Sequence, residues 1–103
     1  MLGCANDPAP TAQLRLAEQA VTQARSVGAS EHTPELALAE KTLTAAVVAM
    51  KDRDYRAARL LAEKAELDAR LAEARVLNEK SQQAVAELNR RIARLREQLG
   101  ELQ

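Results

Sequence analysis

The chain has 103 residues, and its fifteen basic and fifteen acidic side chains give a formal net charge of zero. This balance provides no electrostatic basis for capturing nucleic acid, and no apolar run approaches the roughly 20 residues that a membrane-spanning helix needs. The chain contains 22 alanines but a single aromatic residue, Tyr55, so large aromatic side chains cannot build its core. Richness in Ala, Glu, Lys, Leu and Arg is typical of long helices and coiled coils, and we predict an all-α fold.

Residues 1–10 contain two prolines and several turn-forming residues, which predicts an extended tether before the first helix. Within it, Leu2-Gly3-Cys4-Ala5 resembles the end of a bacterial lipoprotein signal, where small residues precede a cysteine that becomes acylated. We therefore predict lipidation at Cys4. The alternative is that Cys4 is an ordinary exposed thiol.

Two shorter helices are predicted next. Proline suits the first position of a helix, so the first helix should begin near Pro10 or Thr11 and end at Gly28, a typical C-terminal cap. The second should begin at Thr33-Pro34-Glu35, with Thr33 as the N-cap, and end near the polar run that starts at Lys51. Apolar residues recur at intervals of three and four along both segments, which indicates one buried stripe on each helix.

A third helix should run from about residue 54 to 102, because neither Pro nor Gly occurs between Pro34 and Gly100. Asp54 can cap its start, Tyr55 can fill the corner between the second and third helices, and Ala58 can pack there. We predict a helical hairpin or three-helix arrangement over residues 11–79. Residues 80–103 would continue the third helix as a coiled coil.

A heptad repeat supports the coiled coil. Two interleaved series recur every seven residues, one from Leu60 to Leu102 and the other from Lys64 to Leu99. The pattern is strongest after residue 84, and Asn78 lies at a core position that can fix register. We predict that the upstream half serves the bundle within the chain. The predicted coiled-coil core is Asn78, Val85, Leu88, Ile92, Leu95, Leu99 and Leu102.

The residues that flank this core bear on the partner. In a parallel dimer of two copies, three flanking pairs would bring like charges together, each at a cost of a few tenths of a kcal/mol. These pairs are Glu63 with Asp68, Arg70 with Arg75, and Arg91 with Arg96. The pattern therefore disfavours a parallel homodimer. An antiparallel pair, a trimer or a different helical partner stays open.

No residue set for catalysis or metal binding is evident. The single histidine, His32, lies in a polar linker, and the single cysteine leaves no pair of soft ligands. The three glycines are widely separated, which excludes a glycine-rich phosphate loop. We predict no enzyme activity, cofactor, metal or small-molecule substrate. The cluster Arg90, Arg91, Arg94 and Arg96 is interpreted as a charged coiled-coil flank, with docking to an anionic surface as the alternative.

Two segments carry a resemblance to a known family. Leu36-Ala-Leu-Ala-Glu-Lys-Thr-Leu and the longer stretch from Met50 to Ala74 resemble the proteobacterial domain of unknown function 4398, whose members are small predicted lipoproteins. The Gly-Cys-Ala start fits such proteins. The resemblance implies an envelope location and a periplasmic helical module, and Ala5 after the cysteine resembles lipoproteins sorted to the outer membrane. It implies no reaction.

The corner Arg53-Asp54-Tyr55, followed by Ala58, is also similar to the turn of tetratricopeptide repeats, although Arg53 stands where those repeats usually have Gly. There is no second repeat, and such folds need about three. Our main hypothesis is a lipid-anchored scaffold on the periplasmic face of the bacterial outer membrane. It would assemble with itself or with another helical envelope protein. The alternative is a soluble helical adaptor that binds a helix or peptide.

Overall fold

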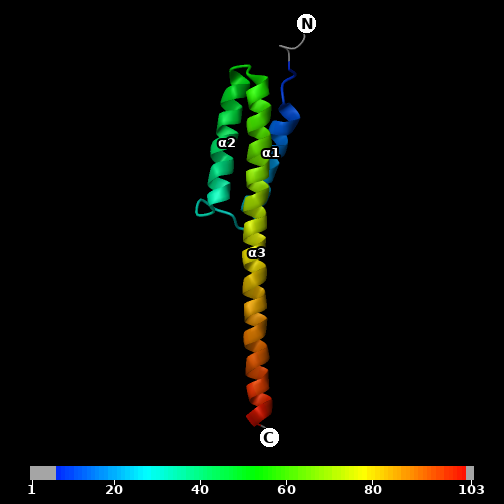
Figure 1. The fold of residues 1–103 in the computed structure, drawn as a ribbon, viewed down its shortest axis with the longest axis vertical. Helices are drawn as coiled ribbons and strands as arrows, with labels where there is room; N and C mark the ends of the chain where they lie inside the picture. The colour runs from blue at the N-terminus through cyan, green and yellow to red at the C-terminus, as the bar shows by residue number, and fades with distance from the viewer. Residues whose placement is uncertain (1–6, 102–103) are drawn as a thin grey trace.

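A computed structural model describes residues 7–101, and it contains three helices: α1 (Thr11–Ser26), α2 (Pro34–Lys51) and α3 (Tyr55–Glu101). The helix α1 starts beside the beginning of α3, α2 returns in the opposite direction, and α3 then runs far past both (Figure 1). The molecule measures 85 × 25 × 15 Å. The predicted all-α arrangement with a long C-terminal helix is thus confirmed.

The core of the bundle is built on alanine. The buried residues of α3 recur at intervals of four and three, which keeps one face of the helix toward α1 and α2. Small side chains there let the three backbones approach closely, and Leu36 of α2 is the largest side chain that is fully buried. The buried residues of α3 are Ala58, Ala62, Ala65, Ala69, Ala72 and Val76.

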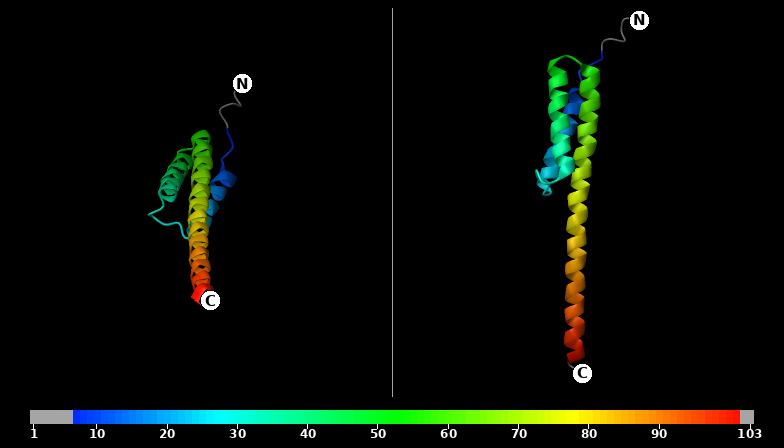
Figure 2. Two further views of the ribbon diagram at one scale, coloured as in Figure 1. Left: turned by 60° about the horizontal axis from the view of Figure 1, so that its bottom comes forward. Right: turned by 60° about the vertical axis from the view of Figure 1, so that its left-hand side comes forward.

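The shorter helices contribute the stripes that the sequence predicts. In α1, Ala17, Val21 and Ala24 are buried, while Leu36, Ala39 and Ala46 are buried in α2. Thr42 of α2 is buried as well, which the apolar pattern did not indicate. Both helices lie along the first half of α3 only, as the two further views show (Figure 2).

One prediction about the bundle is wrong. The leucine heptad was expected to serve the intrachain bundle in its upstream half, but Leu60, Leu67 and Leu71 are each more than half exposed. The bundle uses the alanine series instead. Ala58 and Leu60 are two residues apart, which is about 200° around a helix. The leucines therefore lie on the side of α3 that faces away from α1 and α2.

Both short helices end in the same kind of turn. After α1, Gly28 has φ of 114°, its N–H donates to Arg25 O at 3.0 Å, and the Ala29 N–H donates to Ala24 O at 3.0 Å. This pair of bonds is the Schellman motif, in which a left-handed residue satisfies the last carbonyls of a helix. The prediction that Gly28 caps the first helix agrees with this geometry.

The corner after α2 repeats the motif without a glycine. Arg53 has φ of 60°, its N–H donates to Met50 O at 3.1 Å, and the Asp54 N–H donates to Ala49 O at 2.9 Å. Asp54 then caps α3, because its Oδ1 accepts from the Ala57 N–H at 3.2 Å. Tyr55 is half-buried at this corner. Thr33, by contrast, makes no capping bond to α2, and its Oγ1 accepts from the Ser30 N–H at 3.2 Å.

Replacing Arg53 with glycine should stabilise the protein by about 1 kcal/mol, because the left-handed conformation costs a side-chain-bearing residue about that much. Arg56→Gly is the matched control, since Arg56 is exposed within the first turn of α3. It should lose up to about 1 kcal/mol. Urea unfolding followed by circular dichroism measures both. A loss of stability in Arg53→Gly equal to that of the control would contradict the left-handed assignment.

Candidate interaction surface

The most distinctive surface of the molecule is a line of exposed apolar side chains on α3, which we call the outer stripe. Its members are exposed by 38% at Ile92 to 68% at Leu67. They occupy the core positions of the predicted heptad, and they continue from the bundle half into the half of α3 that extends alone. The outer stripe consists of Leu60, Leu67, Leu71, Val85, Leu88, Ile92, Leu95 and Leu99.

The predicted coiled-coil core falls on this surface with one residue outside the described range. Asn78 is exposed and lies in the same line as Leu71 and Val85. Leu102 lies outside residues 7–101, as does Cys4. The last α3 residue buried against α1 and α2, which together we call the hairpin, is Val76. The stretch from Val85 to Leu99 therefore has no cover within the part of the chain that the structure describes.

Ion pairs within the chain flank the outer stripe. Lys64 Nζ donates to Asp68 Oδ2 at 2.9 Å, and Arg70 Nη2 donates to Glu66 Oε2 at 2.5 Å, each four residues apart on α3. Such pairs support an exposed helix by a few tenths of a kcal/mol. They also engage charges that would otherwise face a partner helix, which bears on the orientation of any assembly.

One ion pair joins α2 to α3. Arg75 donates two parallel hydrogen bonds to Glu35, Nε to Oε1 and Nη2 to Oε2, both 2.7 Å long. These bonds, with a backbone hydrogen bond, hold the pKa of the Glu35 carboxyl below its ordinary value and raise that of Arg75. Because the folded pKa of Glu35 is depressed, the pair stabilises the fold above the unfolded pKa. That contribution is lost as the pH falls through the folded pKa.

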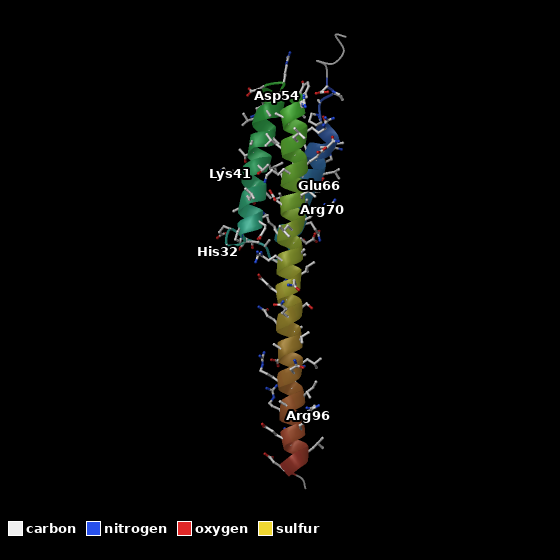
Figure 3. All side chains as sticks on the ribbon, in the orientation of Figure 1. His32, Lys41, Asp54, Glu66, Arg70 and Arg96 are labelled. Carbon is white, nitrogen blue, oxygen red and sulfur yellow. The ribbon has the colours of Figure 1, made fainter. Side chains whose placement is uncertain are left out.

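The arginine cluster of the extended half is balanced by one acid. Glu87 accepts from Arg90 at 2.8 Å and from Arg91 at 3.2 Å, and Arg94 lies 3.7 Å away. Figure 3 shows Arg96 near the end of α3, with Lys41 and His32 on the hairpin. The sharing of one carboxylate by three guanidinium groups leaves a net positive flank beside Leu88 and Ile92, in keeping with a charged coiled-coil edge.

A shallow groove lies between α1 and α3. Its volume is about 280 Å³, and it is open to solvent along much of its length. Its walls come from Leu16, Gln19, Ala20, Gln23, Arg70 and Glu73. Gln23 Nε2 donates to Glu73 Oε2 at 3.0 Å across it, so polar groups of the groove already bind each other.

Residues 7–101 carry no metal cluster and no membrane-spanning helix. No group of three or more His, Cys, Asp or Glu side chains in this range could hold a metal ion. Within the same range, no helix has the length and apolar character that crossing a membrane requires. His32 is exposed in the loop before α2, where Figure 3 labels it.

Comparison with known proteins identifies the family. The chain is 53% identical to a DUF4398 family protein from Pseudomonas aeruginosa PAO1, whose crystal structure superimposes with a TM-score of 0.90 and covers 93% of this chain and 100% of the other. Among curated proteins, none matches the sequence significantly. The family model for DUF4398, a domain of unknown function, matches residues 12–88, which includes α1 except its first residue, all of α2 and most of α3. The protein is therefore a member of the DUF4398 family.

Proposed function

We propose that the protein is a non-enzymatic scaffold of the bacterial outer membrane, held by a lipid on Cys4, whose helix α3 binds a partner helix on the periplasmic side. The observation that carries this proposal is the outer stripe. Exposed apolar side chains gathered on one face mark an interaction site in soluble domains, and here they form two blocks, Leu60 to Leu71 and Val85 to Leu99. A stripe that follows a heptad on a straight helix has the form that another helix fits.

The position of the chain start supports the anchor. Residues 7–10 lead into α1 at the end of the bundle where α3 begins, as Figure 1 shows. A lipid attached shortly before them would hold this end at the membrane. The extended half of α3 would then point away from the membrane, and the residues from Val85 to Leu99 would reach farthest from it.

The anchor is tested by the intact mass of the protein purified from its native host, together with membrane fractionation of a Cys4→Ser variant. Acylated Cys4 and a shift of the variant from the membrane to the soluble periplasmic fraction are expected, because serine cannot carry the thioether-linked lipid that would anchor the chain. A free thiol on Cys4 in the native protein would remove the anchor from the proposal.

A second candidate is a soluble helical adaptor, and the groove between α1 and α3 favours it. An extended peptide could lie along Leu16 and Ala20, with Arg70 and Glu73 at its edge. Substitution of Leu16 by Glu would weaken capture of such a peptide and leave the outer stripe untouched. Substitution of Leu95 by Glu would do the reverse. Pull-down from a periplasmic extract with both variants separates the two surfaces.

A further inference from the structure

The outer stripe runs along the whole of α3, including the half that carries the hairpin. At Leu60, Leu67 and Leu71 the opposite side of the same helix is buried against α1 and α2. A partner helix can therefore follow α3 from Leu60 to Leu99 without meeting the hairpin. We propose that this partner is a second copy of the chain, paired parallel and in register along the outer stripe. This rests on the proposed function and names its partner.

The size of the surface fits a stable dimer. The eight side chains of the outer stripe are each between about two-fifths and two-thirds exposed. Covering them on two copies would bury roughly 1,500 Å² in total, which lies within the range of specific protein–protein interfaces. Only a helix of similar length can cover so long a stripe, and a second α3 has that length.

The ion pairs remove the objection that the flanking charges raise against a parallel pair. In the pair of Glu63 with the partner's Asp68, the aspartate is bound by Lys64 of its own chain at 2.9 Å. The other two like-charged pairs also contain at least one arginine that is bound within its own chain. These bonds are Arg70 to Glu66, Arg75 to Glu35 and Arg91 to Glu87. At least one charge of each like-charged pair is thus screened before the copies meet.

Asn78, the polar residue between the two halves of the outer stripe, suits the same orientation. In a parallel pair in register, Asn78 of one copy faces Asn78 of the other, and their side-chain amides can donate and accept in turn. A single buried Asn pair of this kind fixes the register and favours two strands. At its own layer Lys64 faces Lys64 of the partner subunit, and each ammonium stays paired with Asp68 of its own chain at 2.9 Å, so this layer does not favour the parallel pair.

The direction of the chain adds a last argument. The helices α1 and α3 begin at the same end of the molecule (Figure 1). A parallel pair places residues 7–10 of both copies at one end, where two lipids could enter one membrane. An antiparallel pair along the whole stripe would place them at opposite ends, roughly 60 Å apart at 1.5 Å per residue.

Disulfide trapping in a Cys4→Ser background tests the orientation with the full chain. Ile92→Cys places two thiols at one core layer of a parallel pair, where the Cα atoms lie close enough to bridge. We expect most of this variant to form a covalent dimer under mild oxidation. The matched control Gln83→Cys lies on the side away from the stripe and should stay mostly uncrosslinked.

A mixture of Leu67→Cys and Ile92→Cys proteins distinguishes the opposite orientation, because the antiparallel register that covers the whole stripe brings these two positions together. The parallel pair predicts only dimers of like chains. A mixed dimer as the main product would overturn the proposal. So would a light-scattering mass near 11.2 kDa for the Cys4→Ser protein at about 50 μM, since a dimer has twice the mass of one chain.

A final variant separates assembly from folding. Leu88→Glu with Leu95→Glu changes only the half of α3 that extends beyond Val76, so the hairpin should remain folded by circular dichroism. The dimer dissociation constant should rise more than 100-fold. An unchanged mass for this double variant would also overturn the proposal. An unmodified Cys4 combined with a trapped parallel dimer would instead refute the anchor and leave the pairing intact.

Discussion

Ala65→Leu should disrupt the packing of the hairpin on α3, with a loss of about 3 kcal/mol in the free energy of unfolding. Ala65 is fully buried within a cluster that also contains Ala17, Ala46 and Ala62 from three different helices. A leucine there would force the helices apart, and inserting methylenes into a well-packed core costs about 1 to 3 kcal/mol. The cost should be near the top of that range, because alanine neighbours have no side-chain torsion with which to make room.

The control for this variant is Ala86→Leu, on the exposed half of α3. Both changes keep a good helix former, so helix propensity cancels between them. Chemical unfolding followed by circular dichroism should show a large loss for Ala65→Leu and almost none for Ala86→Leu. Equal effects would mean that α1 and α2 do not lie against the alanine face.

Leu36→Ala should lower the free energy of unfolding by a similar amount, here because it leaves a cavity and not because it overfills the core. Leu36 belongs to the cluster at the end of the hairpin nearest the extended half of α3, together with Val21, Ala24 and Val76. Removing its side chain leaves a cavity, for which losses of 2 to 5 kcal/mol are typical. We expect about 3 kcal/mol, with a melting temperature lower by more than 10 °C for a chain of this size.

Leu38→Ala is the matched control, because Leu38 lies two residues away on α2 and is 44% exposed. It removes the same atoms from a surface position and should change stability by less than 1 kcal/mol. Thermal melts of the two variants at one protein concentration make the comparison, since dimerisation would make the melting temperature depend on concentration. A comparable drop for both would show that Leu36 is not the centre of this cluster.

The ends of the helices could be predicted from sequence because local chemistry determines them. Pro34 begins α2, Gly28 ends the turn after α1, and Asp54 caps α3, and each acts within a few residues of itself. The left-handed turn at Arg53 was less predictable. Its conformation follows from the two hydrogen bonds that close the end of α2. A glycine at this position would have indicated the turn, but the sequence has Arg53 there.

The choice of face on α3 could not be made from the sequence alone. The helix carries two apolar lines, one of alanines and one of leucines, and their spacing is the same. Larger side chains gain more from burial, which favoured the leucines for the bundle. The two short helices instead pack against the alanine line of α3, because alanine side chains allow the closest approach between helices. The leucines are left for the outside.

Contacts between helices could not be predicted from the sequence either. The bond between Glu35 and Arg75 joins residues 40 positions apart, and its existence depends on how far α2 slides along α3. Sequence spacing says nothing about that offset. The pairing of Gln23 with Glu73 depends on the same kind of offset between α1 and α3. By contrast, the pairs of Glu66 with Arg70 and Lys64 with Asp68 follow from spacing within one helix.

The uninterrupted course of α3 also limits how the length of this chain can change. Each residue of a helix advances the chain by 1.5 Å and turns it by about 100°. One residue inserted after Val76 would therefore rotate Val85 to Leu99 by more than a quarter turn relative to Leu60 to Leu71. The two halves of the stripe would then face different directions. Insertions or deletions of seven or eleven residues turn the two halves by only about 20° relative to each other, so changes of these lengths keep the stripe on one side of α3.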